Sequence, residues 1–191
     1  MKKIILASTS PRRKEILEKV NLKFEIKESF YKEDLNLKMP PKKLVEYLSL
    51  GKAKAVEKEC KEGIIIAADT IVVYKQKVLG KPFTEEKAKE MLTFLSGKKH
   101  EIITGVTIIN KYTDTYISFH DSTKVIMKKL NSQTIDNYIA TKEPLDKAGG
   151  YALQGIGSVL IEKIEGNFFN AMGLPVNKLY EELKKMGVDI L

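Results

Sequence analysis

The chain contains very little cysteine. Cys60 is the only one among 191 residues, so neither an internal disulfide nor a cysteine-rich zinc cluster can form. Long apolar runs are also missing, and none approaches the length of a transmembrane helix. We therefore expect a cytoplasmic protein that does not associate with a membrane.

Standard catalytic motifs are missing as well. The sequence contains no GxxxxGK[ST], GxGxxG or GxSxG pattern, and His100 and His120 lack the spacing of metal ligands. These absences argue against a P-loop enzyme, a dinucleotide-binding oxidoreductase and a serine hydrolase.

Arginine is scarce in a chain that is rich in lysine. Of 33 basic residues only Arg12 and Arg13 are arginines, and they are adjacent. Residues 3–7 predict a buried strand and residues 8–10 a turn, with Ser10 as N-cap and Pro11 as the first residue of a helix. Both arginines then lie in the first helical turn, where the helix dipole disfavours cations. The pattern favours an anion site over a pair of surface ion pairs.

The net charge of +8 permits binding of anionic ligands. The lysines are spread along the whole chain rather than clustered, which weighs against nucleic acid as a partner. A hydrophobic content of 43% and a charged content of 30% are ordinary for a globular protein. The length suits one domain spanning residues 1–191.

Apolar periodicity and turn residues predict a mixed α/β fold with hairpins in its sheet. The strand at 63–68 is expected to end at Asp69 and Thr70, and a separate hairpin to follow. The remaining segments are expected as helices at 11–20, 41–61, 84–95, 131–141 and 175–187, and as strands at 71–79, 100–110, 115–128 and 158–164.

Two predicted strands run into polar clusters, at Ser8-Thr9-Ser10 and at Asp69-Thr70. Ligands in open α/β sheets bind beyond the carboxyl ends of strands, so the two ends could line one cleft. Asp69 fits catalysis and the capping of a turn equally well. Lys52 and Lys81 each follow a glycine that would let a phosphate approach the backbone, although a solvated lysine is the default interpretation.

The glycine-rich loop at 146–155 combines a flexible backbone with Tyr151 and Gln154. These groups suit recognition of a base or sugar edge, and the alternative is a simple connecting loop. Arginines, lysines and carboxylates together fit nucleotide phosphates with Mg²⁺, which takes one or two carboxylates plus phosphate oxygens and waters.

Eight segments resemble the Maf family of nucleoside triphosphate pyrophosphatases, and they occur in the family's order along nearly the whole chain. They are LASTSPRR (6–13), AADT (67–70), LGKP (79–82), LSG (95–97), TGV (104–106), EPLDKAG (143–149), QG (154–155) and MGLP (172–175).

The resemblance implies a two-lobed α/β fold, similar to that of the inosine triphosphatases, with a mixed sheet flanked by helices and a central nucleotide cleft. It implies hydrolysis of dTTP and UTP to the monophosphate and pyrophosphate with Mg²⁺ or Mn²⁺. The resemblance further implies that the protein removes non-canonical nucleotides and is linked to cell-division arrest. A homodimer is compatible with it, although no exposed apolar stripe demands one.

The resemblance also implies roles for individual residues. Asp69 would accept a proton from the attacking water, and Glu33, whose neighbouring sequence departs from the family pattern, would join it as a metal ligand. Lys52 and Lys81 match the phosphate-contacting lysines. Ser8, Arg12 and Arg13 match the phosphate loop.

Substrate choice in the family tracks Arg12, Thr70 and Gln154, and this chain follows the dTTP/UTP pattern at Arg12 and Thr70. Two alternatives stay open. One is a pyrophosphatase for 7-methyl-GTP, and the other is a non-catalytic regulator of septum formation that binds nucleic acid or a division partner.

Overall fold

The structure is a computed structural model that describes residues 2–191. The chain forms two compact units, each built from separate stretches of sequence. The first unit comprises the chain up to Asp69, Thr104–Asp121 and Gly173–Leu191, and the second comprises Thr70–Ile103 and Ser122–Met172. The expected single domain of residues 1–191 spans both units.

The sheet is mixed, as the sequence predicts. Its strands follow the order β2-β1-β3-β5-β6-β7, and β4 pairs with β3. β1 is parallel to both β2 and β3, whereas the pairs β3–β4 and β6–β7 are antiparallel. The strands are β1 (Ile4–Leu6), β2 (Glu25–Ile26), β3 (Ile64–Tyr74), β4 (Lys77–Leu79), β5 (Lys99–Asn110), β6 (Thr115–Met127) and β7 (Ile161–Glu165).

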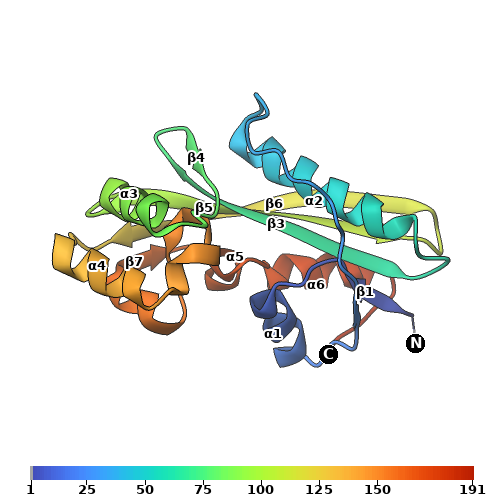
Figure 1. Cartoon of the computed structure of the whole chain (residues 1–191). Helices are drawn as coiled ribbons and strands as arrows, with labels where there is room; N and C mark the ends of the chain where they lie inside the picture. The colour runs from blue at the N-terminus through green and yellow to red at the C-terminus, as the bar shows by residue number, and fades with distance from the viewer. Residues whose placement is uncertain (1) are drawn as a thin grey trace. The chain divides into compact units, whose positions relative to one another are not determined.

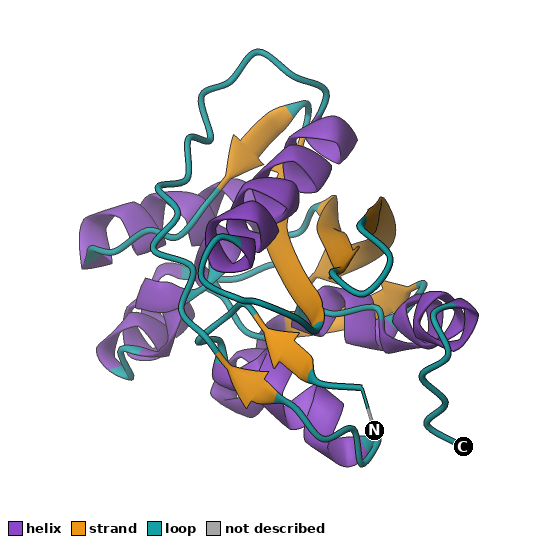
Figure 2. Cartoon of the chain, turned by 90° about the vertical axis from the view of Figure 1, so that its right-hand side faces the viewer, coloured by secondary structure: helices purple, strands orange, loops and turns teal. Residues whose placement is uncertain are grey.

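Three helices cover the strands of the first unit. α2 (Pro41–Glu57) lies on one face, and α1 (Pro11–Lys19) and α6 (Val176–Lys185) lie on the other (Figures 1 and 2). Because β1 and the first half of β3 are covered on both sides, their side chains form a continuous apolar run rather than an alternating one.

Helix α2 rests directly on the backbone of β5 at Gly105. A Cβ atom at this position would lie 2.3 Å from the carbonyl carbon and oxygen of Val45 and 2.7 Å from the nitrogen of Glu46. Only glycine permits such an approach of helix backbone to strand.

The second unit contains α3 (Glu85–Leu95), α4 (Ser132–Ala140), the short helix α5 (Phe168–Met172) and three 3₁₀ segments between Glu143 and Leu160. The side chains of Thr84 and Asn131 cap α3 and α4 by accepting a backbone N–H. Lys75 and Gln76, both with positive φ, form the tight turn of the predicted β3–β4 hairpin.

The structure corrects four expected boundaries. β3 does not end at Asp69 and Thr70, because it continues through them to Tyr74. The helix that begins at Pro41 ends at Glu57 rather than near residue 61. The strand expected at 158–164 is β7, which begins only at Ile161, and α5 lies in a stretch that was expected to be irregular.

No helix within residues 2–191 combines the length and the apolar character that a bilayer crossing requires.

A buried histidine anchors the core of the second unit. Nε2 of His100 lies 2.6 Å from the hydroxyl of Tyr151, and the two rings meet edge to face. Each residue is only 3% exposed. Burial lowers the pKa of His100 to about 4 and raises the pKa of Tyr151 above its ordinary value. Both groups are therefore neutral at pH 7.

We predict that this histidine makes the protein less stable in acid. Between pH 6.5 and pH 4 the unfolded chain binds a proton at His100 that the folded chain does not, so the free energy of unfolding falls as the pH drops, by about 3 kcal/mol in total. Denaturant titrations of wild type and His100→Gln at pH 7.5, 6 and 5 measure this. An equally steep pH dependence in the variant would contradict the assignment to His100.

Candidate active site

Asp69 lies within β3 at a point where its neighbouring strand has already ended. The parallel register pairs Leu6, the last residue of β1, with Ile66, so Asp69 lies three residues beyond the end of β1. The polar residues after β1 begin at Ser8, so Ser8 and Asp69 both lie beyond the carboxyl end of β1 in the first unit. The sequence misplaced the end of β3, which continues beyond Asp69 to Tyr74.

Lys52 bridges two carboxylates in the first unit. Its ammonium nitrogen lies 2.5 Å from Oδ1 of Asp69 and 2.6 Å from Oε1 of Glu33. The side chains of Lys52 and Asp69 are 10% and 5% exposed, whereas that of Glu33 is 39% exposed. Three residues that are far apart in the sequence thus form one charged cluster.

The second carboxylate oxygen of Asp69 is buried and has no hydrogen-bond partner among the described residues. A buried acceptor without a donor is unfavourable unless water, a cation or a substrate proton completes it. The described residues hold no group of three or more His, Cys, Asp or Glu side chains that could bind a metal by themselves. The pair Asp69 and Glu33 nevertheless fits Mg²⁺, which needs only one or two carboxylates when phosphate oxygens and waters supply the rest.

Arg13 holds the start of α1 in place. Its Nε donates to the carbonyl of Gly173 at 2.9 Å, and Nη1 donates to Oγ of Ser8 at 3.0 Å. Oγ of Ser8 also accepts the backbone N–H of Ser10 at 3.3 Å. Ser10 is the N-cap residue of α1 as predicted, but its side chain makes no capping hydrogen bond.

Positive charge gathers at this helix start. Burial lowers the pKa of the Arg13 guanidinium from its ordinary value, the Asp69 carboxylate opposes that shift, and the charge of Arg12 adds to it. An arginine remains protonated despite such a shift. The first turn of α1 thus carries two cations and no acidic residue. This arrangement suits an anion, as the sequence indicates.

Three further predicted residues belong to the second unit. Thr70 follows Asp69 within β3 and is half-buried, and Gln154 is half-buried just before the 3₁₀ segment Gly155–Leu160. Lys81 is exposed after β4, in a segment that is fixed at both ends. Gly80 accepts the backbone N–H of Gly149 at 3.0 Å, and Phe83 donates its own to Leu145 at 3.0 Å.

The sequence did not reveal the residues that hold the loop of Gln154. The hydroxyl of Tyr138 accepts the backbone N–H of Ala152 at 3.1 Å, and Oε2 of Glu143 accepts that of Gly157 at 2.8 Å. The Tyr151–His100 contact described above fixes the same loop. His100 and Tyr138 carried no sequence signal, because an isolated polar residue in an apolar segment does not indicate its distant partner.

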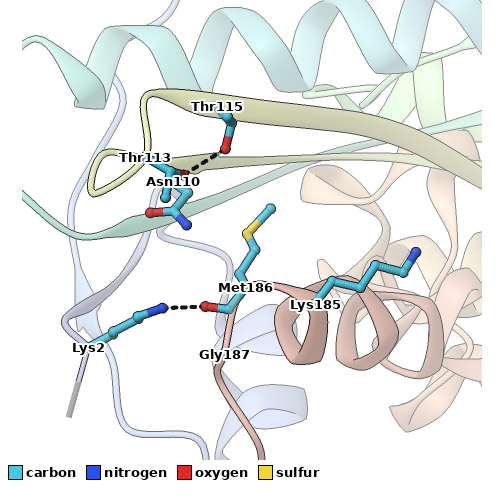
Figure 3. Close-up of a pocket in the computed structure, with 7 residues that line it drawn as sticks. All are labelled: Lys2, Asn110, Thr113, Thr115, Lys185, Met186 and Gly187. Atoms are coloured by element: carbon cyan, nitrogen blue, oxygen red, sulfur yellow. Dashed lines mark hydrogen bonds between the residues drawn. The ribbon is translucent and has the colours of Figure 1, made fainter.

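A pocket elsewhere in the first unit contains none of the predicted site residues (Figure 3). It has a volume of about 330 Å³. Lys2 donates to the backbone carbonyl of Met186, and the hydroxyls of Thr113 and Thr115 hydrogen-bond each other at 2.8 Å. Among residues 2–191, none that lines it carries a carboxylate. The lining residues are Lys2, Asn110, Thr113, Thr115, Lys185, Met186 and Gly187.

Comparisons with known proteins agree with the motifs. The chain is 48% identical, over all of its own length and 93% of its relative's, to a dTTP/UTP pyrophosphatase of Bacillus cereus (strain ATCC 10987 / NRS 248). It is 47% identical to a dTTP/UTP pyrophosphatase of Bacillus thuringiensis subsp. konkukian (strain 97-27), covering 98% of that protein.

Among solved structures, the fold is similar to that of the Staphylococcus aureus Ham1 protein, with a TM-score of 0.55 and 12% identity over 97% of this chain and 100% of the other. This likeness concerns the fold alone and agrees with the predicted mixed α/β architecture. The family described as Maf-like protein matches residues 3–186. The chain therefore belongs to the Maf-like protein family.

Proposed function

We propose that this protein is a nucleoside triphosphate pyrophosphatase that hydrolyses dTTP and UTP to the monophosphate and pyrophosphate. The observation that carries the proposal is the contact of the buried Lys52 with Asp69 and Glu33, in the same unit as Arg12 and Arg13. The names of relatives that are 47–48% identical over the full chain support the choice of substrate.

Asp69 is the proposed general base. A water oxygen bonds to the α-phosphorus while the bond from that phosphorus to the bridging oxygen breaks, and pyrophosphate leaves with the electron pair. The proton of the water passes to the Asp69 carboxylate. Because little covalent chemistry falls to the protein in such a reaction, positioning and charge neutralisation carry most of the catalysis.

The cationic residues are proposed to balance the negative charge of the carboxylates and of the substrate phosphates. In the absence of substrate, the Lys52 ammonium offsets one of the two negative charges of Asp69 and Glu33 and so reduces the repulsion between these carboxylates. Arg12, Arg13 and Ser8 at the start of α1 suit an anionic phosphate group. We assign Lys81 to phosphate contact, and Thr70 and Gln154 to substrate choice, on the family resemblance.

A divalent cation, Mg²⁺ or Mn²⁺, completes the proposal. Asp69 and Glu33 are the residues that would hold it, and the unpartnered buried oxygen of Asp69 supports this assignment. When bound, the cation would supply charge neutralisation at the phosphates. We propose that the reaction takes place in the cytoplasm and that the ligand is a small nucleotide rather than a nucleic acid. We also propose that the protein forms a homodimer.

The first prediction concerns the substrate and the metal. In an assay of pyrophosphate release from dTTP, UTP, CTP, dATP, GTP and 7-methyl-GTP, we expect turnover mainly of dTTP and UTP, abolished by EDTA. A preference for 7-methyl-GTP would overturn the roles given to Arg12, Thr70 and Gln154. No turnover of any nucleotide would remove the enzymatic proposal and favour a regulator, which retention on DNA at varied salt would then test.

The second prediction concerns the base. Asp69→Asn should lower kcat by about a thousandfold, the typical contribution of a general base, while circular dichroism shows an unchanged fold. Asp121→Asn is a suitable control, because Asp121 is also an aspartate of the first unit that pairs with a lysine, Lys178, at 2.8 Å. Near-normal turnover by Asp69→Asn would exclude the role.

The third prediction separates the two arginines. Arg12→Lys should reduce kcat/KM by about tenfold or more with little change in stability, since lysine keeps the charge but loses the planar fork. Arg13→Lys should also reduce the free energy of unfolding by about 1–3 kcal/mol, because the buried hydrogen bond to Gly173 is lost. Steady-state kinetics and denaturant titrations measure both effects, and a fully active Arg12→Lys would refute the first.

A further inference from the structure

Glu33 is carried by a long segment without regular structure. Residues 27–40 connect β2 to α2 and form neither helix nor strand. In Figure 1 this part of the chain runs as a thin blue trace along α2 to the start of that helix. Its side chains are mostly exposed or half-buried, so few contacts are available to fix the Glu33 carboxylate beside Lys52.

One of those contacts is unusually close. A Cβ atom at Gly51 would lie 2.3 Å from Cζ, 2.5 Å from Cε2 and 2.8 Å from the hydroxyl oxygen of Tyr31. Side-chain carbons do not approach one another to such distances, so the Tyr31 ring occupies the space that any other residue at position 51 would fill. The glycine that interrupts the pattern of α2 therefore has a packing reason.

A second contact fixes the same ring. The Tyr31 phenol also lies close to that of Tyr47, which lies one helical turn before Gly51 on α2. Burial raises the pKa of Tyr31 above its ordinary value, and proximity to Tyr47 raises it further. The phenol is therefore neutral at pH 7 and can donate a hydrogen bond throughout the physiological range.

The backbone next to this ring adopts a conformation that its own side chain does not explain. Phe30 has a φ of 45°, in the left-handed region that bulky residues avoid, and it is 81% exposed. A residue with so little packing does not stabilise such a conformation by itself. The neighbouring Tyr31, held on α2, provides the constraint that keeps it.

We propose that Tyr31 and Gly51 form a seat that positions Glu33. Tyr31 lies two residues before Glu33, and Gly51 lies immediately before Lys52, so the ring-on-glycine contact sets the spacing of the two charged groups that meet at 2.6 Å. Tyr31 is thus a positioning residue that acts through Glu33. The seat stands on geometry alone, whereas its effect on catalysis rests on the proposed function.

Gly51→Ala tests the seat most directly, because the added methyl group displaces the ring while alanine favours the helix. Hydrogen–deuterium exchange of the peptides covering residues 27–40, without nucleotide, should become about tenfold faster in Gly51→Ala and in Tyr31→Ala. Tyr31→Phe keeps the ring and should stay close to wild type. Lys42→Ala, an exposed position on the same helix, is the matched control and should change nothing. Unchanged exchange in Gly51→Ala would overturn the seat.

A second measurement tests the link to Glu33. In Gly51→Ala and Tyr31→Ala the Mg²⁺ concentration that gives half-maximal turnover should rise by about tenfold, whereas KM for the nucleotide changes little. Tyr31→Phe should keep the Mg²⁺ concentration of the wild type. Direct Mn²⁺ binding to the nucleotide-free protein should weaken in parallel.

The outcomes separate the seat from the proposed function. Faster exchange with unchanged metal dependence would overturn the positioning role. Faster exchange and weaker Mn²⁺ binding in a protein whose wild type hydrolyses no nucleotide would support the seat while refuting the proposed function.

Discussion

The ion pair between Lys52 and Asp69 is the interaction on which the first unit depends. Burial of two charges is strongly unfavourable unless each finds the other at close range, and here their side chains are 10% and 5% exposed at a separation of 2.5 Å. α2 and β3 must therefore keep a fixed distance and rotation. Much of the first unit serves that requirement, from the apolar faces of α2 to its backbone contact at Gly105.

Arg13 is a second buried charge that connects parts of the chain that are distant in sequence. One guanidinium connects the start of α1, the turn after β1 and the carbonyl of Gly173 before α6. A cation near a helix start is unfavourable by itself, but the carbonyl of Gly173, the hydroxyl of Ser8 and nearby carboxylates compensate for it. Arg13 therefore both stabilises the fold and belongs to the proposed anion site. Arg12, which is adjacent to it, is the arginine that we expect to contact the substrate directly.

Much of the fold was predictable from local signals. Periodicity and capping residues located α1, α3, α4 and α6, and the β3–β4 hairpin followed from a polar dipeptide between apolar runs. The end of β3 was misjudged because Asp69 and Thr70 look like a turn in isolation. They tolerate a strand because β1, their neighbour in the sheet, has ended three residues earlier. The short helix α5 carries too few residues for its period to be recognised.

For the candidate site, residue type, position and the family resemblance suggested candidate residues but not their contacts. Asp69, Lys52 and Glu33 meet in the structure, and their convergence depends on tertiary register that no local pattern contains. The residue that packs against Gly51 could not be predicted from the sequence either. A glycine in a helix indicates close packing, but only the structure shows that the ring of Tyr31 lies there.

The contact at Gly105 has a consequence for how the protein tolerates change. Helix α2 meets β5 through main-chain atoms, so no rotamer change or exchange of one apolar side chain for another alters the spacing at that point. The position of Lys52 on α2 therefore depends on the contact between helix and sheet backbones more than on the side chains packed around it. Substitutions of core side chains would therefore lower the free energy of unfolding before they displace the Lys52 ammonium group. The geometry of the charged cluster can persist in relatives whose core residues differ.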